Sequence, residues 1–459
     1  MKTKLFGEFK AVTSKGWKQK IQFDLKGDDY NESLIWNSPE GIQVKPFYHQ
    51  EDISGNQLKV NLPEKWFVGQ VIYAANAREA NQKAIDAIAR GAESISFNIP
   101  SDKIKIKKLL QGIDLNQISL HFDLQFVSDF YVDELMRLPE ISPQKTFLNI
   151  DIIGHLARSG NWYHSMKEDY AKLTSILSGH PDPNGIAVDM SLYQNAGANI
   201  VQQLAYGIAH ANEYLNLIDG NVKIPAANSA FNFKVALGGN YFFEIAKLRA
   251  LRILWQSLTK EYELSSDCHI TAIPSLRNKT IYDYNSNMIR TTTENMAGIL
   301  GGANTINCLP YDFIYNKENE FGERIARNQL LILKHESHLD KVTNASDGSY
   351  YIEKLTVQLA EKALVLFKSI EAGGGFLKQL KEHTIQKKIS ETALKELAHF
   401  NSGEDILVGS NAYQNKMDVM KESLQLYPFV KTKPRKTLIA PIIEKRLAEG
   451  LEQDRLKNE

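Results

Sequence analysis

The chain has 459 residues, which is too long for one ordinary domain and suits a barrel of about 250–350 residues with additions, or two to three smaller domains. Its 54 Lys and Arg balance 54 Asp and Glu, so the net charge is zero. This balance argues against a nucleic-acid surface and a polybasic membrane surface, which both need a cationic excess. The 43% of hydrophobic residues, with 10% aromatics, are enough for a large core and exclude wholesale disorder.

The cellular setting is constrained by three further absences. Cys268 and Cys308 are too few cysteines for a disulfide framework or a thiolate zinc site. No apolar stretch approaches the roughly 18 residues of a membrane span, and the start MKTKLFGEFK has no signal-peptide core. We therefore expect a soluble, cytoplasmic protein.

Residues 1–64 predict an N-terminal arm or cap, because the first 45 residues are polar with scattered aromatics and little periodicity. Such a segment cannot form a core of its own. We expect its aromatic side chains to be buried against the rest of this chain or against a partner. They are Phe6, Trp17, Phe23, Tyr30 and Trp36.

Residues 65–375 predict strands alternating with amphipathic helices such as 78–91 and 240–258. The strand centres lie roughly 25 to 46 residues apart, as right-handed parallel crossovers require. Seven or eight such units indicate a closed TIM-type (β/α)₈ barrel, although an open doubly wound sheet gives the same local pattern. The expected strands are 69–75, 94–99, 119–124, 146–152, 186–190, 231–237, 269–275 and 303–309.

Polar residues within these strands favour the barrel. A parallel strand covered by helices on both faces should be almost wholly apolar. Inward polar residues are explained if the barrel axis is hollow enough for a polar ligand to pass through it. Hydrogen-bonded polar residues at strand ends are the alternative explanation. The residues concerned are Ser94, Ser96, Asn98, Asn149, Asp151, Asn232, Thr305 and Asn307.

The glycine run 371–376 suggests a boundary, and residues 376–459 predict a helical C-terminal extension that ends in a charged tail packed on the surface. Phosphate-binding loops and nucleophile motifs are missing from the sequence. The pair His335 and His338 does not match a zinc pattern, so no metal site is expected. Asp267-Cys268-His269 begins a cobalamin-binding D-x-H-x-x-G pattern, but Ala272 replaces its glycine and the triplet lies at an expected strand.

Several long stretches resemble the cobalamin-dependent acyl-CoA mutase family, and within it methylmalonyl-CoA mutase. They occur in the same order as in the family and cover most of residues 65–410, weakening before 145. The matching stretches are YQNAGA (193–198), ALGGNYFFEIAKLRALRILW (236–255), RTTTENMAGILGGANTI (290–306), RIARNQLLILKHESHLDKVTNASDGSYYIEKLT (324–356) and SGEDILVG (402–409).

This resemblance implies a TIM-type barrel whose axis is threaded by a coenzyme A ester. Catalytic chains of the family continue through a linker into a cobalamin-binding domain. This sequence stops where that linker would start, so the resemblance implies that adenosylcobalamin is bound by a partner and not by this chain.

The residues that differ from catalytic members lie at contacts to the reacting acyl group. Leu192 and Ser191 stand where the family has a His and a Tyr, and leucine can neither donate a hydrogen bond nor carry charge. Thr271 and Ile273 replace a His and a Gln. Four further positions are vestigial by the same comparison. Asn149 stands where the family has a Gln, Ala230 stands where it has an Arg, and Arg158 lies one residue from the family's carboxylate-binding Arg. Tyr73 aligns only uncertainly with the family's substrate-contacting Tyr.

Gln194 keeps the family's residue, and we interpret it as a packing residue in preference to a substrate contact. We expect no catalytic residues on this chain. The resemblance thus implies the small (β) subunit of a heterodimeric mutase, whose large (α) subunit would be the partner. Two alternatives remain: a catalytic chain whose cobalamin domain is a separate protein, and a barrel that binds coenzyme A without chemistry.

Overall fold

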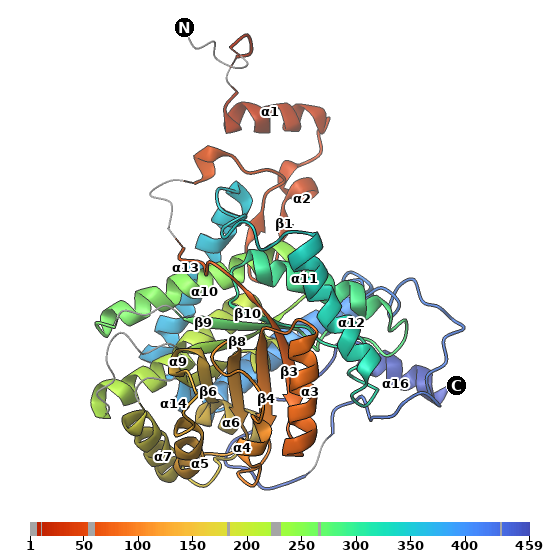
Figure 1. The fold of residues 1–459 in the computed structure, drawn as a ribbon. Helices are drawn as coiled ribbons and strands as arrows, with labels where there is room; N and C mark the ends of the chain where they lie inside the picture. The colour runs from red at the N-terminus through yellow and green to blue at the C-terminus, as the bar shows by residue number, and fades with distance from the viewer. Residues whose placement is uncertain are drawn as a thin grey trace.

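Figure 1 shows the fold of the chain as a computed structural model. The structure describes residues 7–10, 12–53, 60–180, 184–221, 231–264, 268–431 and 434–459. Its centre is a closed barrel of eight parallel strands in the order β10-β3-β4-β5-β6-β7-β8-β9, which confirms the predicted TIM-type barrel over the open sheet. The strands are β3 (Phe67–Tyr73), β4 (Ser94–Ile99), β5 (Ser119–Leu124), β6 (Thr146–Ile150), β7 (Asn184–Asp189), β8 (Asn232–Leu237), β9 (His269–Pro274) and β10 (Thr305–Asn307).

The predicted strands differ from the observed ones mainly at their ends. Residues 151–152, expected at the end of a strand, lie beyond β6, because Asp151 accepts a hydrogen bond from the Gly154 N–H and caps the helix α6 that starts at Ile152. The last strand is also shorter than expected, since only Thr305–Asn307 pair with β3 and β9.

Helices surround the barrel and bury its outer face. The helices between strands are α3 (Ala77–Ala89), α4 (Ile106–Leu109), α5 (Asp129–Met136), α6 (Ile152–Ser159), α7 (Met166–Gly179), α8 (Ser191–Asn195), α9 (Ile200–Asn221), α10 (Tyr241–Glu261) and α11 (Ser286–Leu300). They are followed by α12 (Glu320–Leu331), α13 (Tyr350–Ala372), α14 (Phe376–Lys381), α15 (Thr384–Ser402) and α16 (Glu449–Lys457). Short helical turns lie at Gln50–Asp52, Pro143–Lys145 and Ile332–Glu336.

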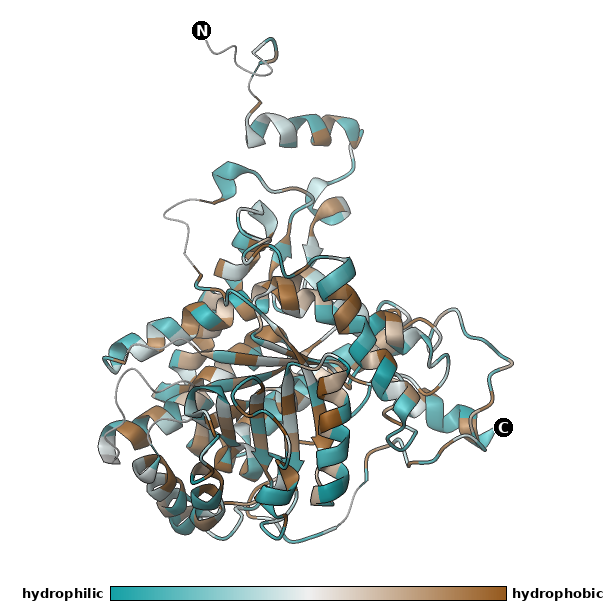
Figure 2. Ribbon diagram, viewed as in Figure 1, coloured by the Kyte–Doolittle hydropathy of each residue, from teal (hydrophilic) through white to brown (hydrophobic). Residues whose placement is uncertain are grey.

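The strand alternation separates two layers of side chains. In β5, Leu120, Phe122 and Leu124 point outward into the main apolar core, where Phe122 stacks on Phe97 of the neighbouring strand with ring centroids 6.1 Å apart. Ser119, His121 and Asp123 alternate with them and point into the lumen. Figure 2 shows the same division, with hydrophobic residues on the strands and on the faces of the surrounding helices that lie against them.

The N-terminal arm stands away from the barrel, with α1 (Ser14–Asp24) farthest from it (Figure 1). Next come α2 (Tyr30–Leu34) and a two-stranded hairpin of β1 (Trp36–Asn37) and β2 (Gln43–Val44). The hairpin contacts the body through Trp36, whose ring lies 5.6 Å from that of Phe243 in α10. Of the arm's aromatics, Tyr30 is buried, while Trp17 and Phe23 remain 51% and 79% exposed; Phe6 lies outside the described residues.

Candidate functional site: the barrel lumen and its mouth

Three aromatic rings close the barrel axis in the N-terminal half of the strands. His121 of β5 stacks on Phe147 of β6 with ring centroids 4.3 Å apart, and Phe147 lies 4.3 Å from His269 of β9. His121 and His269 are themselves 5.2 Å apart. Because β5 and β9 are four strands apart in a closed barrel of eight, these two rings meet across the axis. We call this group the lumen plug.

Both plug histidines are neutral in the folded protein at ordinary pH. Burial lowers the pKa of His121 from 6.5 to about 4, against a smaller opposing effect of Asp123. Burial also holds the pKa of His269 well below 6.5, and the neighbouring His121 lowers it further. His269 Nε2 pairs with Thr305 Oγ1 at 3.1 Å.

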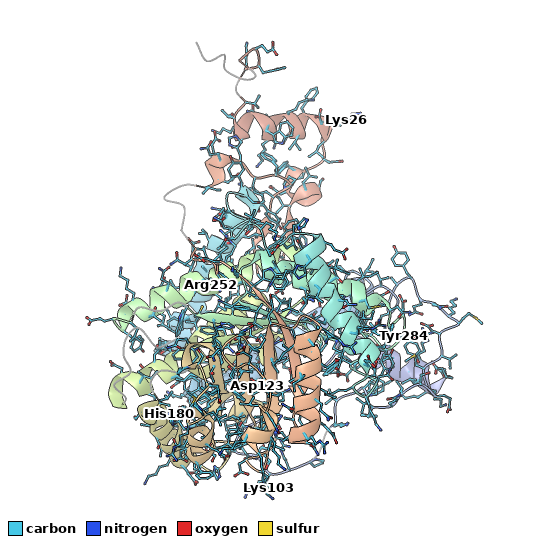
Figure 3. All side chains as sticks on the ribbon, viewed as in Figure 1. Lys26, Lys103, Asp123, His180, Arg252 and Tyr284 are labelled. Carbon is cyan, nitrogen blue, oxygen red and sulfur yellow. The ribbon has the colours of Figure 1, made fainter. Side chains whose placement is uncertain are left out.

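Above the plug, one chain of hydrogen bonds crosses the lumen. Thr271 Oγ1 donates to Asn232 Oδ1 (2.9 Å), and Asn232 Nδ2 donates to Asn149 Oδ1 (2.8 Å). Asn149 Nδ2 then donates to Asp123 Oδ1 (2.8 Å), whose other oxygen accepts from Lys234 Nζ (3.0 Å). Asp123 is labelled among the barrel strands in Figure 3. The predicted positions Asn149 and Thr271 are thus brought together, with their polar groups satisfied within the chain.

At the mouth, Arg158 of α6 is neutralised by two carboxylates of its own chain. Its Nη2 lies 2.8 Å from Asp189 Oδ2 at the end of β7, and its Nη1 pairs with Glu444. Burial would lower the pKa of Arg158, but these carboxylates raise it above its usual value. Ser191 also donates to Asp189. Arg158 and Ser191 therefore share one partner.

Glu444 reaches the mouth because residues 434–447, here called the C-terminal strap, cross the βα side of the barrel. The Ile442 N–H donates to Ala157 O (2.8 Å) and the Lys445 N–H to Asn195 O (3.0 Å). Asn195 Nδ2 in turn donates to Glu444 Oε1 at 3.0 Å. The strap lies within residues 431–459, which were expected to be only a packed surface tail, and it forms part of the mouth instead.

The other predicted site positions are dispersed. Leu192 is fully buried in the apolar core, and Gln194 Oε1 accepts a hydrogen bond from the buried Lys247 Nζ (2.8 Å). Tyr73 and Ile273 occupy inward positions near the C-terminal ends of β3 and β9 without joining either polar group. Ala230 lies outside the described residues.

A buried hydrogen-bonded cluster around Asp151 lies below the mouth, and no sequence motif predicted it. Asp151 accepts hydrogen bonds from Tyr214 OH (2.7 Å) and from the Gly154 and Asp189 N–H groups (2.7 and 2.9 Å). His210 Nε2 lies 2.9 Å from the same carboxylate, and its Nδ1 pairs with Tyr193 OH at 2.9 Å. Burial would raise the pKa of Asp151, but His210 and these donors hold it at about 2.

The sequence's one candidate cobalamin ligand, His269, does not fit that role. His269 is stacked in the lumen plug, so its imidazole cannot serve as an axial ligand presented to a cobalt ion at a surface. Across the described ranges, no group of three or more His, Cys, Asp and Glu side chains is placed to hold a metal ion. Within the same ranges, no helix has the length and apolar character needed to cross a bilayer.

A closed barrel of eight parallel strands surrounded by helices defines an α/β protein of the TIM-barrel class. Residues 99–449 match the methylmalonyl-CoA mutase family. The chain is 33% identical over 93% of its length to the methylmalonyl-CoA mutase small subunit of Porphyromonas gingivalis, of which it covers 73%. It therefore belongs to the methylmalonyl-CoA mutase family.

Two further relatives extend this finding. The chain is 27% identical over 84% of its length to the methylmalonyl-CoA mutase small subunit of Streptomyces virginiae, covering 68% of that protein. It is 29% identical over 87% of its length to the methylmalonyl-CoA mutase of Cereibacter sphaeroides and spans 64% of it.

Proposed function

We propose that this chain is the small, non-catalytic subunit of a heterodimeric methylmalonyl-CoA mutase. Its large subunit binds adenosylcobalamin and interconverts methylmalonyl-CoA and succinyl-CoA, while this chain stabilises the large subunit by mass action. The relatives named as small subunits support this role. The observation that carries the proposal is the lumen plug.

The side chains inside the barrel leave no room for a coenzyme A ester on the axis. A coenzyme A ester that threads the barrel needs a continuous passage between the strands. His121 and His269 meet across that passage, and Phe147 fills the space beside them. Moving these side chains aside would uncouple packed rings in a dense interior, which costs several kcal/mol. The ester is therefore excluded from the lumen.

Lys234 and Arg158, the cations described above at the lumen and its mouth, are already paired with carboxylates of this chain. An acyl carboxylate needs a cation that is free to pair with it. Lys234 is held by Asp123, and Arg158 is held by Asp189 and Glu444. Leu192, at a position where catalytic relatives are expected to have a histidine, offers no hydrogen bond. The chain's own carboxylates thus occupy the places that a substrate would need.

Reconstitution tests the proposal. We expect no methylmalonyl-CoA turnover from the isolated chain with adenosylcobalamin, and full turnover when the large subunit is added. Turnover by this chain with a separate cobalamin-binding protein would instead identify the split catalytic mutase and contradict the proposal. Micromolar binding of coenzyme A to the isolated chain would favour the coenzyme A-binding barrel.

Removing residues 1–25, which include α1 but leave the buried Tyr30 in place, is expected to weaken heterodimer formation at least tenfold. Helix α1 buries none of its residues against this chain, and Trp17 and Phe23 are left exposed, so they are available to a partner surface. The dissociation constant for the large subunit measures the effect. Truncation should leave the melting temperature of the isolated chain nearly unchanged; undiminished co-purification with the large subunit would contradict the prediction.

A further inference from the structure

An apolar groove of about 630 Å³ lies between α15 and the C-terminal strap with the start of α16. Ala393 and Leu397 line it from α15, and Ile442 and Leu447 line it from the opposite side. Its volume is in the range of small-molecule sites, so it has room for more than one large side chain.

The two walls of the groove are fixed to each other. Gln386 Nε2 of α15 donates to Ala440 O at 2.9 Å. Arg277 connects both walls, because its Nε donates to Glu396 Oε2 (2.6 Å) and its Nη1 to Lys445 O (2.7 Å). The groove is therefore preformed, and its occupant would not have to organise it.

Three large aliphatic side chains stand exposed around the groove. Leu394, Ile443 and Leu451 come from three different segments and are 62%, 49% and 41% exposed. A small molecule bound in the groove would leave these rim side chains in water. A protein surface would cover the rim and the groove together, which favours a polypeptide occupant.

The charged side chains along the groove indicate the sign of the charge that a partner surface should carry. Arg277 pairs with Glu396, Arg446 with Glu452 and Asp454 with Lys457, all lining or bordering the groove. Lys445 also lines it, and no acidic side chain of the described residues pairs with its ammonium group. A second copy of this chain in a two-fold contact would bring two unpaired Lys445 cations, and no unpaired carboxylate of the described residues lining the groove, into one interface, which disfavours self-association here.

We propose that this groove is a docking surface for the large subunit, which inserts large apolar side chains flanked by a carboxylate that pairs with Lys445. The inference rests on the proposed function, since it names a second contact surface in the same heterodimer. It lies on the βα side of the barrel, beside the strap that carries Glu444, whereas the arm contact is made by residues before β3.

Binding of this full-length chain to the large subunit tests the groove. The double variant Leu394→Glu/Ile443→Glu is expected to raise the dissociation constant at least tenfold. Val365→Glu, at a 70% exposed position of α13 outside the groove, is the matched control and should change it less than twofold. The Lys445→Gln variant should weaken binding several-fold at low salt and reduce the dependence of the dissociation constant on salt concentration.

Hydrogen exchange gives a second measurement that does not depend on variants. We expect slower exchange over 386–401 and 441–451 in the complex than in the free chain. Two results would overturn the docking proposal but leave the proposed function standing, provided that the wild-type chains form the complex. One is unchanged exchange over these residues, and the other is a double variant that binds the large subunit as tightly as the control. If the double variant loses self-association but still binds the large subunit normally, the occupant of the groove is a second copy of this chain, and the docking proposal is overturned. Failure of the wild-type chains to associate would overturn both.

Discussion

Replacing Asp151 with Asn is expected to lower the free energy of unfolding by about 4 kcal/mol. The carboxylate accepts from Tyr214 OH and from two backbone N–H groups, and it faces His210. An amide in its place turns one acceptor into a donor among donors, which leaves buried groups unpaired. Chemical denaturation at neutral pH measures the loss.

The matched control for this change is Asp86→Asn, because Asp86 is exposed and, among the described residues, its ion-pair partner is Arg90 one helical turn away, at 2.8 Å. That variant should stay within about 0.5 kcal/mol of the wild type. Since the folded pKa of Asp151 is about 2, below its ordinary 3.8, the wild-type advantage should persist above pH 3.8 and shrink as the pH falls toward 2. Equal stability of the two variants would show that Asp151 is not a structural hub.

Acidification is expected to destabilise the protein through His121. Its pKa is about 4 in the folded state and 6.5 in the unfolded state, so between these values the unfolded state binds more protons. The free energy of unfolding should therefore fall as the pH drops from 6.5 to 4, by about 3 kcal/mol from this residue alone.

The His121→Gln variant keeps a polar, neutral side chain and should lose that part of the pH dependence. Unfolding followed at several pH values between 6.5 and 4 gives the comparison, with His399→Gln on the exposed face of α15 as the control. The control should retain the wild-type slope. If His121→Gln retains it as well, His121 is accessible to protons in the folded state and the plug is not dry.

The barrel was predictable because its signal is local and repeated. Each strand carries its own apolar run, and the spacing between runs fixes the crossovers. Polar residues in β4, β6, β8 and β10 also suggested a polar layer inside the barrel. In the structure, Thr271, Asn232 and Asn149 form one chain of hydrogen bonds there. The two explanations of that pattern left open by the sequence differ only in whether the axis is open.

The sequence could not predict that the barrel axis is closed, because the closure depends on contacts between residues that are far apart in the chain. His121 and His269 lie on strands that are four apart in the barrel of eight, and no spacing rule brings them together. Glu444 is similar: nothing in a charged, proline-broken tail indicates that one carboxylate pairs with Arg158. Such pairings follow from topology and not from local pattern.

The most direct test of the account is the number of coenzyme A ester sites in the purified heterodimer. Titration of the complex with succinyl-CoA in a calorimeter is expected to give one site per heterodimer, because the lumen plug excludes the ester from this chain. Two sites per heterodimer, with one of them abolished by a bulky substitution in the lumen of this chain, would contradict the central claim.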